Sequence, residues 1–200
     1  TLLKLADKFE IDHIYCESIE AHEELDEEIR LRQSKIDLHT SYQSGLFFND
    51  QIPFELSNLP DIFTNFRKEI EAKKIKPDKP LTIDQKINEI KSINDEESIT
   101  FKEELKAYTK SSFPISDNRF SGGEDRGLAY LETYFSSNKP STYKKTRNEL
   151  MGIDFSTKFS PWLASGYISA RQIYDFLLTY ESNVSKNEST YWIFFELLWR

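Results

Sequence analysis

The first third of the chain alternates between helical and extended hydrophobic patterns. Apolar residues recur at helical spacing in 2–9 and 59–73, and the charged stretch at 20–35 also predicts a helix. Between them, 11–16 (IDHIYC) and 36–43 (IDLHTSYQ) are rich in β-forming residues and predict two strands. Helix, strand, helix, strand, helix is the order of a doubly wound α/β domain.

Two strands do not make such a sheet by themselves, so we expect residues 1–74 to be the C-terminal part of an α/β domain that begins upstream. Residues 75–115 are polar and poor in aromatic side chains, and predict an interdomain linker with helical turns near 83–92 and 101–109. The chain opens without Met and stops without a helix stop signal. We interpret it as an internal piece of a longer protein.

Residues 116–200 carry no strand pattern, and helix start and stop signals follow one another along them. Helices are predicted within 122–135, at 141–152, and from an Asn or Ser cap near residue 187 to the end. The signals are Ser121 with Glu124 and Ser169 with Gln172 as capping boxes, Ser160 with Pro161 as N-cap and first helical residue, and Gly152 and Gly166 as helix ends. This part is predicted to be the N-terminal part of an all-α domain.

Charge is distributed unevenly along the chain. Residues 116–200 hold equal numbers of acidic and basic side chains, so the net charge of −8 comes from residues 1–115. The acidic part is a poor partner for nucleic acid, because phosphate contacts need Lys and Arg, whereas the neutral part remains open to it. A single cysteine, Cys16, excludes an internal disulfide framework and indicates a reducing compartment, which we expect to be the cytoplasm. No stretch has the ~18 apolar residues of a membrane span.

Polar side chains gather at 156–160 (STKFS), directly before the predicted short helix. Hydroxyl groups, an ammonium group and unpaired backbone N–H groups together suit an anion such as a diphosphate. The alternative is an ordinary N-cap at Ser160 that is preceded by polar loop residues, and the pattern leaves both open.

The final predicted helix combines an acid, a base and indoles. Helical spacing places Trp192, Glu196 and Arg200 on one face, with Trp199 beside them, so that they could line a pocket for a flat ligand. The alternative is a core helix with one ion pair at its solvent-facing end. The three histidines, His13, His22 and His39, lack ligand spacing, so the sequence predicts no metal site.

These stretches resemble a known family. Residues 143–174 (YKKTRNELMGIDFSTKFSPWLASGYISARQIY) and 187–200 (NESTYWIFFELLWR) closely resemble the flavin-binding domain of the cryptochrome/photolyase family, and the DASH cryptochrome branch matches best. Residues 122–135 resemble the helix that opens this domain, and 59–71 resemble the last helix of the α/β antenna domain. The resemblance implies a photolyase-type α/β domain at 1–74 followed by a helical FAD-binding domain.

The resemblance implies an FAD site. Ser156, Thr157, Lys158, Phe159 and Ser160 match the loop that wraps the FAD diphosphate and ribityl chain. Tyr143 matches a tyrosine that reaches the flavin phosphate region, and Arg200 matches a position near the flavin.

The reaction implied is deoxyribodipyrimidine photo-lyase activity: electron transfer from reduced FAD to a cyclobutane pyrimidine dimer, with single-stranded DNA as the substrate of the DASH branch. Glu196 matches the carboxylate that hydrogen-bonds the dimer, and Trp192 resembles the tryptophan against which it stacks. Trp199 and Arg200 match the DNA-facing rim. Glu20 is the candidate contact for an antenna folate, 5,10-methenyltetrahydrofolate.

The resemblance further implies a monomer, and we expect this fragment to be inactive in isolation. Two rival functions stay open at this point. One is a blue-light photoreceptor that binds FAD and signals to a partner without repairing DNA; the other is a flavin-free helical binding module.

Overall fold

The computed structural model describes residues 2–81, 120–149 and 154–200. The helical turns predicted near 83–92 and 101–109, and the helix end predicted at Gly152, lie outside these residues.

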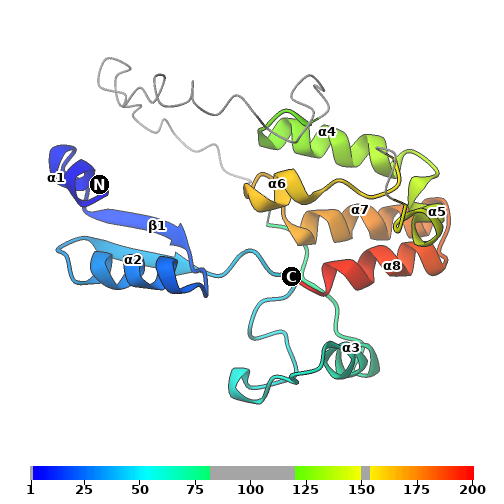
Figure 1. The fold of residues 1–200 in the computed structure, drawn as a ribbon, viewed down its shortest axis with the longest axis horizontal. Helices are drawn as coiled ribbons and strands as arrows, with labels where there is room; N and C mark the ends of the chain where they lie inside the picture. The colour runs from blue at the N-terminus through cyan, green and yellow to red at the C-terminus, as the bar shows by residue number, and fades with distance from the viewer. Residues whose placement is uncertain (1, 82–119, 150–153) are drawn as a thin grey trace.

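The N-terminal part is a small βαβ unit (Figure 1). Its elements are α1 (Leu2–Lys8), β1 (His13–Glu17), α2 (His22–Arg32) and β2 (Asp37–Ser41). The two strands pair in parallel, with His13 opposite Asp37 and Tyr15 opposite His39. A parallel pair needs a crossover, and α2 supplies it. The guanidinium of Arg32 holds α2 to β2 by donating to Thr40 Oγ1 (3.0 Å) and to the Leu38 carbonyl (3.4 Å). The predicted order of elements is confirmed.

After β2 the chain leaves the βαβ unit and joins the helices. Leu46 and Phe47 are buried in the helical core, and the Leu46 amide donates to the carbonyl of Arg200 at 3.1 Å. A short 3₁₀ turn, η1 (Leu56–Asn58), and helix α3 (Phe63–Ala72) follow. The segment between β2 and η1 therefore packs against the helical part.

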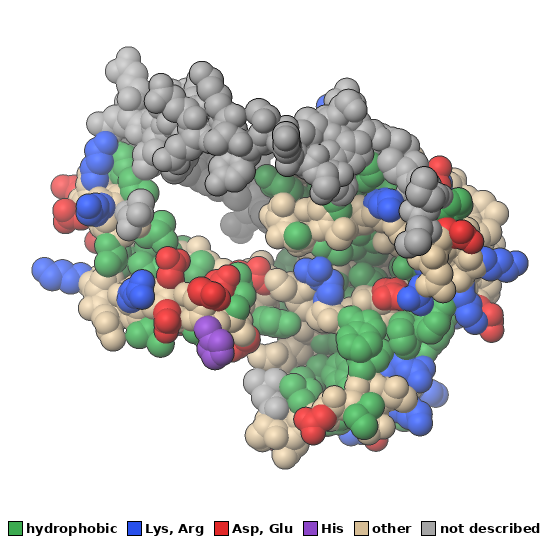
Figure 2. Space-filling view, viewed as in Figure 1, with side chains coloured by type: hydrophobic (Ala, Val, Ile, Leu, Met, Phe, Trp, Pro, Cys, Tyr) green, Lys and Arg blue, Asp and Glu red, His purple; other side chains and the backbone are tan. Residues whose placement is uncertain are grey.

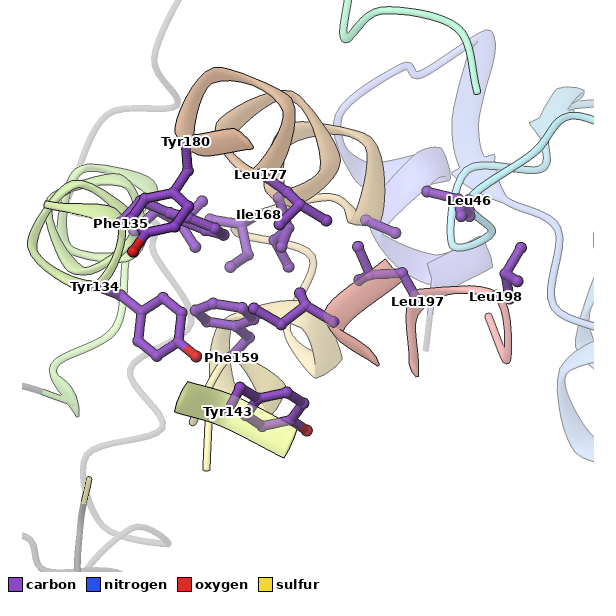
Figure 3. Close-up of a cluster of buried hydrophobic side chains, with 14 of the residues drawn as sticks. Leu46, Tyr134, Phe135, Tyr143, Phe159, Ile168, Leu177, Tyr180, Leu197 and Leu198 are labelled. Atoms are coloured by element: carbon purple, nitrogen blue, oxygen red, sulfur yellow. The ribbon is translucent and has the colours of Figure 1, made fainter. Parts of the chain in front are cut away.

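The C-terminal part is a set of helices in which α4, α7 and α8 lie over one another (Figure 1). Its elements are α4 (Glu124–Phe135), α5 (Lys139–Thr146), α6 (Ser160–Ala164), α7 (Ala170–Asn183) and α8 (Glu188–Leu197). Among the described residues of this part there is no strand, as predicted. The core between the helices is largely aromatic: Phe159 packs edge-on against Tyr134, with the ring centroids 5.0 Å apart, and Tyr143 joins the same cluster (Figure 3).

Two of the predicted helix starts are confirmed in detail. Ser169 and Gln172 form a complete capping box at α7, in which each side chain bonds the other's backbone N–H. Asn187 caps α8 by accepting from the amides of Ser189 and Thr190. Side-chain caps of this kind satisfy amides that the helix leaves unpaired.

The other predicted caps are wrong. Helix α4 begins at Glu124 with Gly123 as its N-cap, and no side chain caps it, because Gly123 has a φ of 101° that carries the chain away from Ser121. Helix α6 already includes Ser160, so Phe159 is its N-cap, although Gly166 ends this turn with a φ of 70° as expected. Helix α5 starts earlier than predicted, at Lys139, and ends at Thr146.

Gly127 allows α4 to approach α6 closely. A Cβ atom at this position would lie 2.7 Å from Ile168 Cγ2 and 3.1 Å from Trp162 Cδ1. Trp162 is buried, and its indole N–H donates to the Ser121 carbonyl at 3.0 Å, so the ring cannot shift without losing that bond.

We predict that Gly127→Ala lowers stability by about 1 kcal/mol or more, since overpacking costs roughly 1–3 kcal/mol and the gain in helix propensity returns at most about 1 kcal/mol. Chemical denaturation would measure the loss. Gly122→Ala is the matched control, because its Cβ would meet nothing closer than 3.6 Å. Equal stability of the two variants would contradict the close packing.

Candidate functional site

Helices α5 and α8 are joined by polar contacts along their length. Near the start of α8, the Asn187 side-chain amide donates to the Ser141 carbonyl (3.1 Å), and the Lys144 amide donates to Ser189 Oγ (3.1 Å). Lys144 Nζ also lies 3.0 Å from Glu188 Oε2. These contacts fix which face of α8 meets α5.

The next turn of both helices forms what we call the Glu196 cluster: Tyr143, Lys144, Arg147, Trp192 and Glu196. Trp192 and Glu196 are one turn apart on α8, as are Tyr143 and Arg147 at the end of α5. Arg147 joins the two pairs: its Nη2 atom lies 2.9 Å from Glu196 Oε1, and its guanidinium carbon lies 5.0 Å from the centroid of the Trp192 ring. The guanidinium of Arg147 thus contacts both Trp192 and Glu196, the two residues predicted to share a helix face.

The carboxylate of Glu196 retains acceptor capacity. Its Oε1 atom is buried and makes no hydrogen bond of good geometry, although it is within ion-pair distance of Arg147. The two charges attract each other at this short distance. The N–H groups of Arg147 are misaligned with Glu196 Oε1, and a hydrogen bond weakens steeply as its angle departs from linear. A buried acceptor without a donor is costly, so this oxygen is suited to accept or share a proton with a ligand.

Tyr143 senses the charges of the cluster. Burial raises the pKa of its hydroxyl, the negative charge of Glu196 raises it further, and the positive charge of Arg147 opposes the rise. The phenol therefore stays protonated as a hydrogen-bond donor well above neutral pH.

In the polar loop at 156–160, the polar residues are less buried than Phe159. Phe159 is buried, whereas Ser156, Thr157 and Lys158 are half-buried and Ser160 is exposed. Within the part of the chain that the structure describes, none of these four polar side chains makes a hydrogen bond or an ion pair. Lys158 adopts a left-handed φ of 55°, which is uncommon for a residue other than glycine. Since α6 is one turn of five residues, the side chains rather than a helix dipole would carry any anion contact.

The loop and the Glu196 cluster are connected through α5. Lys139 Nζ, at the start of α5, lies 2.6 Å from Asp154 Oδ1, just before the loop. Phe159 and Tyr143 are members of one buried cluster. A ligand that met the loop would therefore lie on the same helical unit as Glu196.

The chain end does not continue the helix face. We predicted Arg200 on the face of Trp192 and Glu196, and this is wrong, because α8 ends at Leu197. Tighter turn bonds follow, from the Trp199 amide to the Glu196 carbonyl (3.4 Å) and from the Arg200 amide to the Leu197 carbonyl (3.2 Å). Arg200 is exposed.

Trp199 instead meets α3. Its ring stacks on Phe63 with centroids 3.7 Å apart, yet 62% of the residue remains exposed. Nearby, Arg67 donates to the Tyr191 hydroxyl (2.7 Å), which in turn donates to Glu71 (2.6 Å), and this holds α3 against α8. Hydrophobic side chains consequently reach the surface over α8, with charged side chains at their edge (Figure 2).

Glu20, the candidate antenna contact, is exposed in the loop between β1 and α2, within the α/β part of the chain where the antenna was expected. Arg147 and Lys144 were not predicted as site residues. The sequence shows only that Arg147 follows Tyr143 by one helical turn. Its contacts with Glu196 and Trp192 depend on the pairing of α5 with α8.

Comparison with known proteins identifies the family. The chain is 41% identical over 175 residues to cryptochrome DASH of Danio rerio, covering 84% of this chain and 32% of the relative. It is 38% identical over 208 residues to cryptochrome DASH of Synechocystis sp., covering 98% of this chain and 41% of the relative. The chain belongs to the cryptochrome/photolyase family, in its DASH branch. It spans about a third of the length of the curated relatives it matches. No family model matches it.

Solved structures agree with the cryptochrome/photolyase family assignment. The chain superposes on the Synechocystis cryptochrome with a TM-score of 0.73 at 34% identity, covering 98% of this chain and 41% of that one. A class III photolyase of Agrobacterium tumefaciens gives 0.64 at 15% identity, which shows the shared fold. The family is in general one of FAD flavoproteins. No helix among the described residues is long and apolar enough to cross a membrane.

The Glu196 cluster leads to a prediction for the pKa of Tyr143. Glu196→Gln should lower this pKa by removing a nearby negative charge, and Arg147→Gln should raise it by removing the opposing positive charge. NMR titration of ring-labelled tyrosine, assigned with Tyr143→Phe, would measure both shifts. Glu188→Gln is the control, since Glu188 is on the same helix but pairs with Lys144. Identical titration of Tyr143 in the Glu196 and Glu188 variants would contradict the cluster.

Proposed function

We propose that this chain is part of a light-driven flavoprotein that repairs cyclobutane pyrimidine dimers, with FAD as cofactor and single-stranded DNA as substrate. The chain spans about a third of its relatives' length, so the activity is proposed for the whole protein. The observation that carries the proposal is the Glu196 carboxylate, held by Arg147 beside Trp192 with one buried oxygen lacking a hydrogen bond.

The residues of the loop fit FAD. Ser156, Thr157, Lys158 and Ser160 present three hydroxyls and an ammonium with no partner among the described residues, a donor set that suits a diphosphate. Phe159 anchors the loop in the core. We propose that Tyr143 and Arg200 complete this part of the site, Tyr143 as a protonated phenol. When bound and reduced, FAD supplies the electron for dimer splitting after it absorbs light.

Glu196 and Trp192 are the proposed catalytic residues. Trp192 offers an indole to a flat pyrimidine pair, and the carboxyl group of Glu196, when protonated, donates to a pyrimidine carbonyl as negative charge develops there. Arg147 positions the carboxylate through its ion pair with Glu196 Oε1. Lys144, whose Nζ lies 5.7 Å from the Trp192 centroid, adds positive charge beside the same ring.

DNA would approach over α8 and the chain end. The dimer must leave the base stack to reach such a cluster, and unstacking is cheapest in single strands, which is why we propose these as the substrate. Trp199 is largely exposed and so available to a base, and Arg200 is available to a phosphate.

The proposed domain organisation follows the family: an α/β domain that includes 1–74, a linker at 75–115 and a helical FAD-binding domain from 116 onward. An antenna folate, 5,10-methenyltetrahydrofolate, would bind against the α/β domain, with Glu20 as its candidate contact. We propose that the protein acts as a monomer.

A blue-light photoreceptor is the second candidate. The ion pair between Arg147 and Glu196 favours it, because a carboxylate that is already paired with a guanidinium is less available to bind a pyrimidine. The same FAD site would then serve signalling to a protein partner.

The loop prediction tests the cofactor. In the full-length protein, Lys158→Ala with Ser160→Ala should weaken FAD retention by a few kcal/mol, since charge-assisted hydrogen bonds contribute about 1.5–3 kcal/mol each. Flavin absorbance after gel filtration measures it. Lys145→Ala with Ser165→Ala changes the same residue types at exposed positions and should retain FAD. Unchanged flavin content in the loop variant would remove the loop from the site.

The Glu196 prediction tests repair. Glu196→Gln keeps a donor but loses the transferable proton, whereas Glu196→Ala leaves the carbonyl unpaired, so the quantum yield of repair should fall from wild type to Gln to Ala. FAD content should stay unchanged and affinity for damaged single-stranded DNA should fall much less. Glu132→Ala, at an exposed position of α4, is the control and should repair as wild type. Normal repair by Glu196→Ala would make the carboxylate structural and favour the photoreceptor.

A further inference from the structure

Three side chains with metal-binding atoms meet on one face of the two-stranded sheet. His13 is on β1, and Asp37 and His39 are on β2. The parallel register places His13 opposite Asp37, and His39 follows two residues later, so all three point to the same side. They are the one such group among the residues that the structure describes.

The distances within this group match a tetrahedral ion. His13 Nδ1 lies 3.2 Å from His39 Nε2, and Asp37 Oδ2 lies 3.5 Å from His13 Nδ1 and 3.3 Å from His39 Nε2. Zinc binds imidazole nitrogen and carboxylate oxygen at about 2.0–2.2 Å, so two ligand atoms around a tetrahedral zinc ion are about 3.3–3.5 Å apart. The two edges at Asp37 fall within this range and the His13–His39 edge, at 3.2 Å, is slightly shorter, so the triangle is close to one face of a zinc tetrahedron. Octahedral Mg²⁺ at about 2.1 Å would bring its ligand atoms to about 3.0 Å.

Hydrogen bonds account for the triangle less well. A neutral imidazole has one N–H, and a carboxylate has none to give. If both rings donate to Asp37, the N–H groups at His13 Nδ1 and His39 Nε2 face each other across 3.2 Å. If instead one ring donates to the other, the accepting nitrogen carries no proton, and its contact with Asp37 is then not a hydrogen bond. An ion at the centre satisfies all three atoms at once.

The surroundings favour binding of a cation. The ring of Tyr15 stacks on His39 with centroids 4.5 Å apart and an interplanar angle of 12°, which fixes the imidazole orientation. Within the described part of the α/β domain the three side chains are 57%, 64% and 41% exposed for His13, Asp37 and His39, which leaves space there for water as a fourth ligand. The excess of acidic residues in this half of the chain raises the local concentration of cations.

We propose that His13, Asp37 and His39 bind one zinc-type divalent transition-metal ion, with the fourth position held by water. The site is independent of the Glu196 cluster. It also reverses the expectation from sequence, because the two histidines are 26 residues apart and only the strand register brings them together.

Zinc titration of the untagged full-length protein against a chromogenic chelator tests the proposal. We expect one equivalent to bind, and His13→Gln and His39→Gln each to weaken that binding by more than about a hundredfold, beyond the roughly 10–100-fold that the loss of an outer partner typically costs. His22→Gln is the matched control, since His22 lies at the start of α2 outside the triangle, and it should bind as wild type. Absence of binding, or equal loss in all three variants, would overturn the site.

Cobalt(II) substitution gives a second readout that does not depend on the variants. A tetrahedral Co²⁺ site shows intense visible d–d absorption, whereas an octahedral one absorbs weakly. We expect intense bands that disappear in Asp37→Asn and His39→Gln and persist in His22→Gln. Weak bands, or intense bands that survive in the ligand variants, would contradict a tetrahedral site built by these residues.

Discussion

The pairing of α5 with α8 is the contact on which the rest of the helical unit depends. On one side, α8 buries Ile193 and Leu197 in the core, and on the other it presents Trp192 and Glu196 to α5. Helix α5 in turn connects to the polar loop through Lys139 and Asp154. Any ligand that spans the loop and the carboxylate depends on this pairing for its geometry.

The ion pair of Arg147 positions the Glu196 carboxylate but contributes little to the stability of the fold. The side chains of Arg147 and Glu196 are 27% and 35% exposed, and ion pairs near the surface contribute about 0–1 kcal/mol. Burial of aromatic rings contributes more: a large apolar side chain such as Phe159 or Trp162 gains about 1.5–3 kcal/mol when it is fully buried. The fold is thus held by the aromatic core, and the ion pair is available to function.

The sequence predicted what is local and missed what is set by packing. The caps at Ser169 and Asn187 were predictable because the interacting groups lie within one turn of chain. The start of α4 was not, since Gly123 redirects the backbone, and the end of α8 was not, because apolar side chains continue past Leu197. The shared helix face of Trp192 and Glu196 was predictable from helical spacing, whereas the positions of Arg147 and of the triangle of His13, Asp37 and His39 depend on contacts between elements.

A double-mutant cycle on Arg147 and Glu196 tests the central claim most directly, with the quantum yield of dimer repair by the full-length protein as the readout. If Arg147 acts by positioning the carboxylate, Arg147→Gln should reduce repair only while Glu196 is present, and adding it to Glu196→Ala should cause no further loss. Additive losses, with each substitution reducing repair by the same factor in either background, would contradict the claim that these two residues form one functional unit.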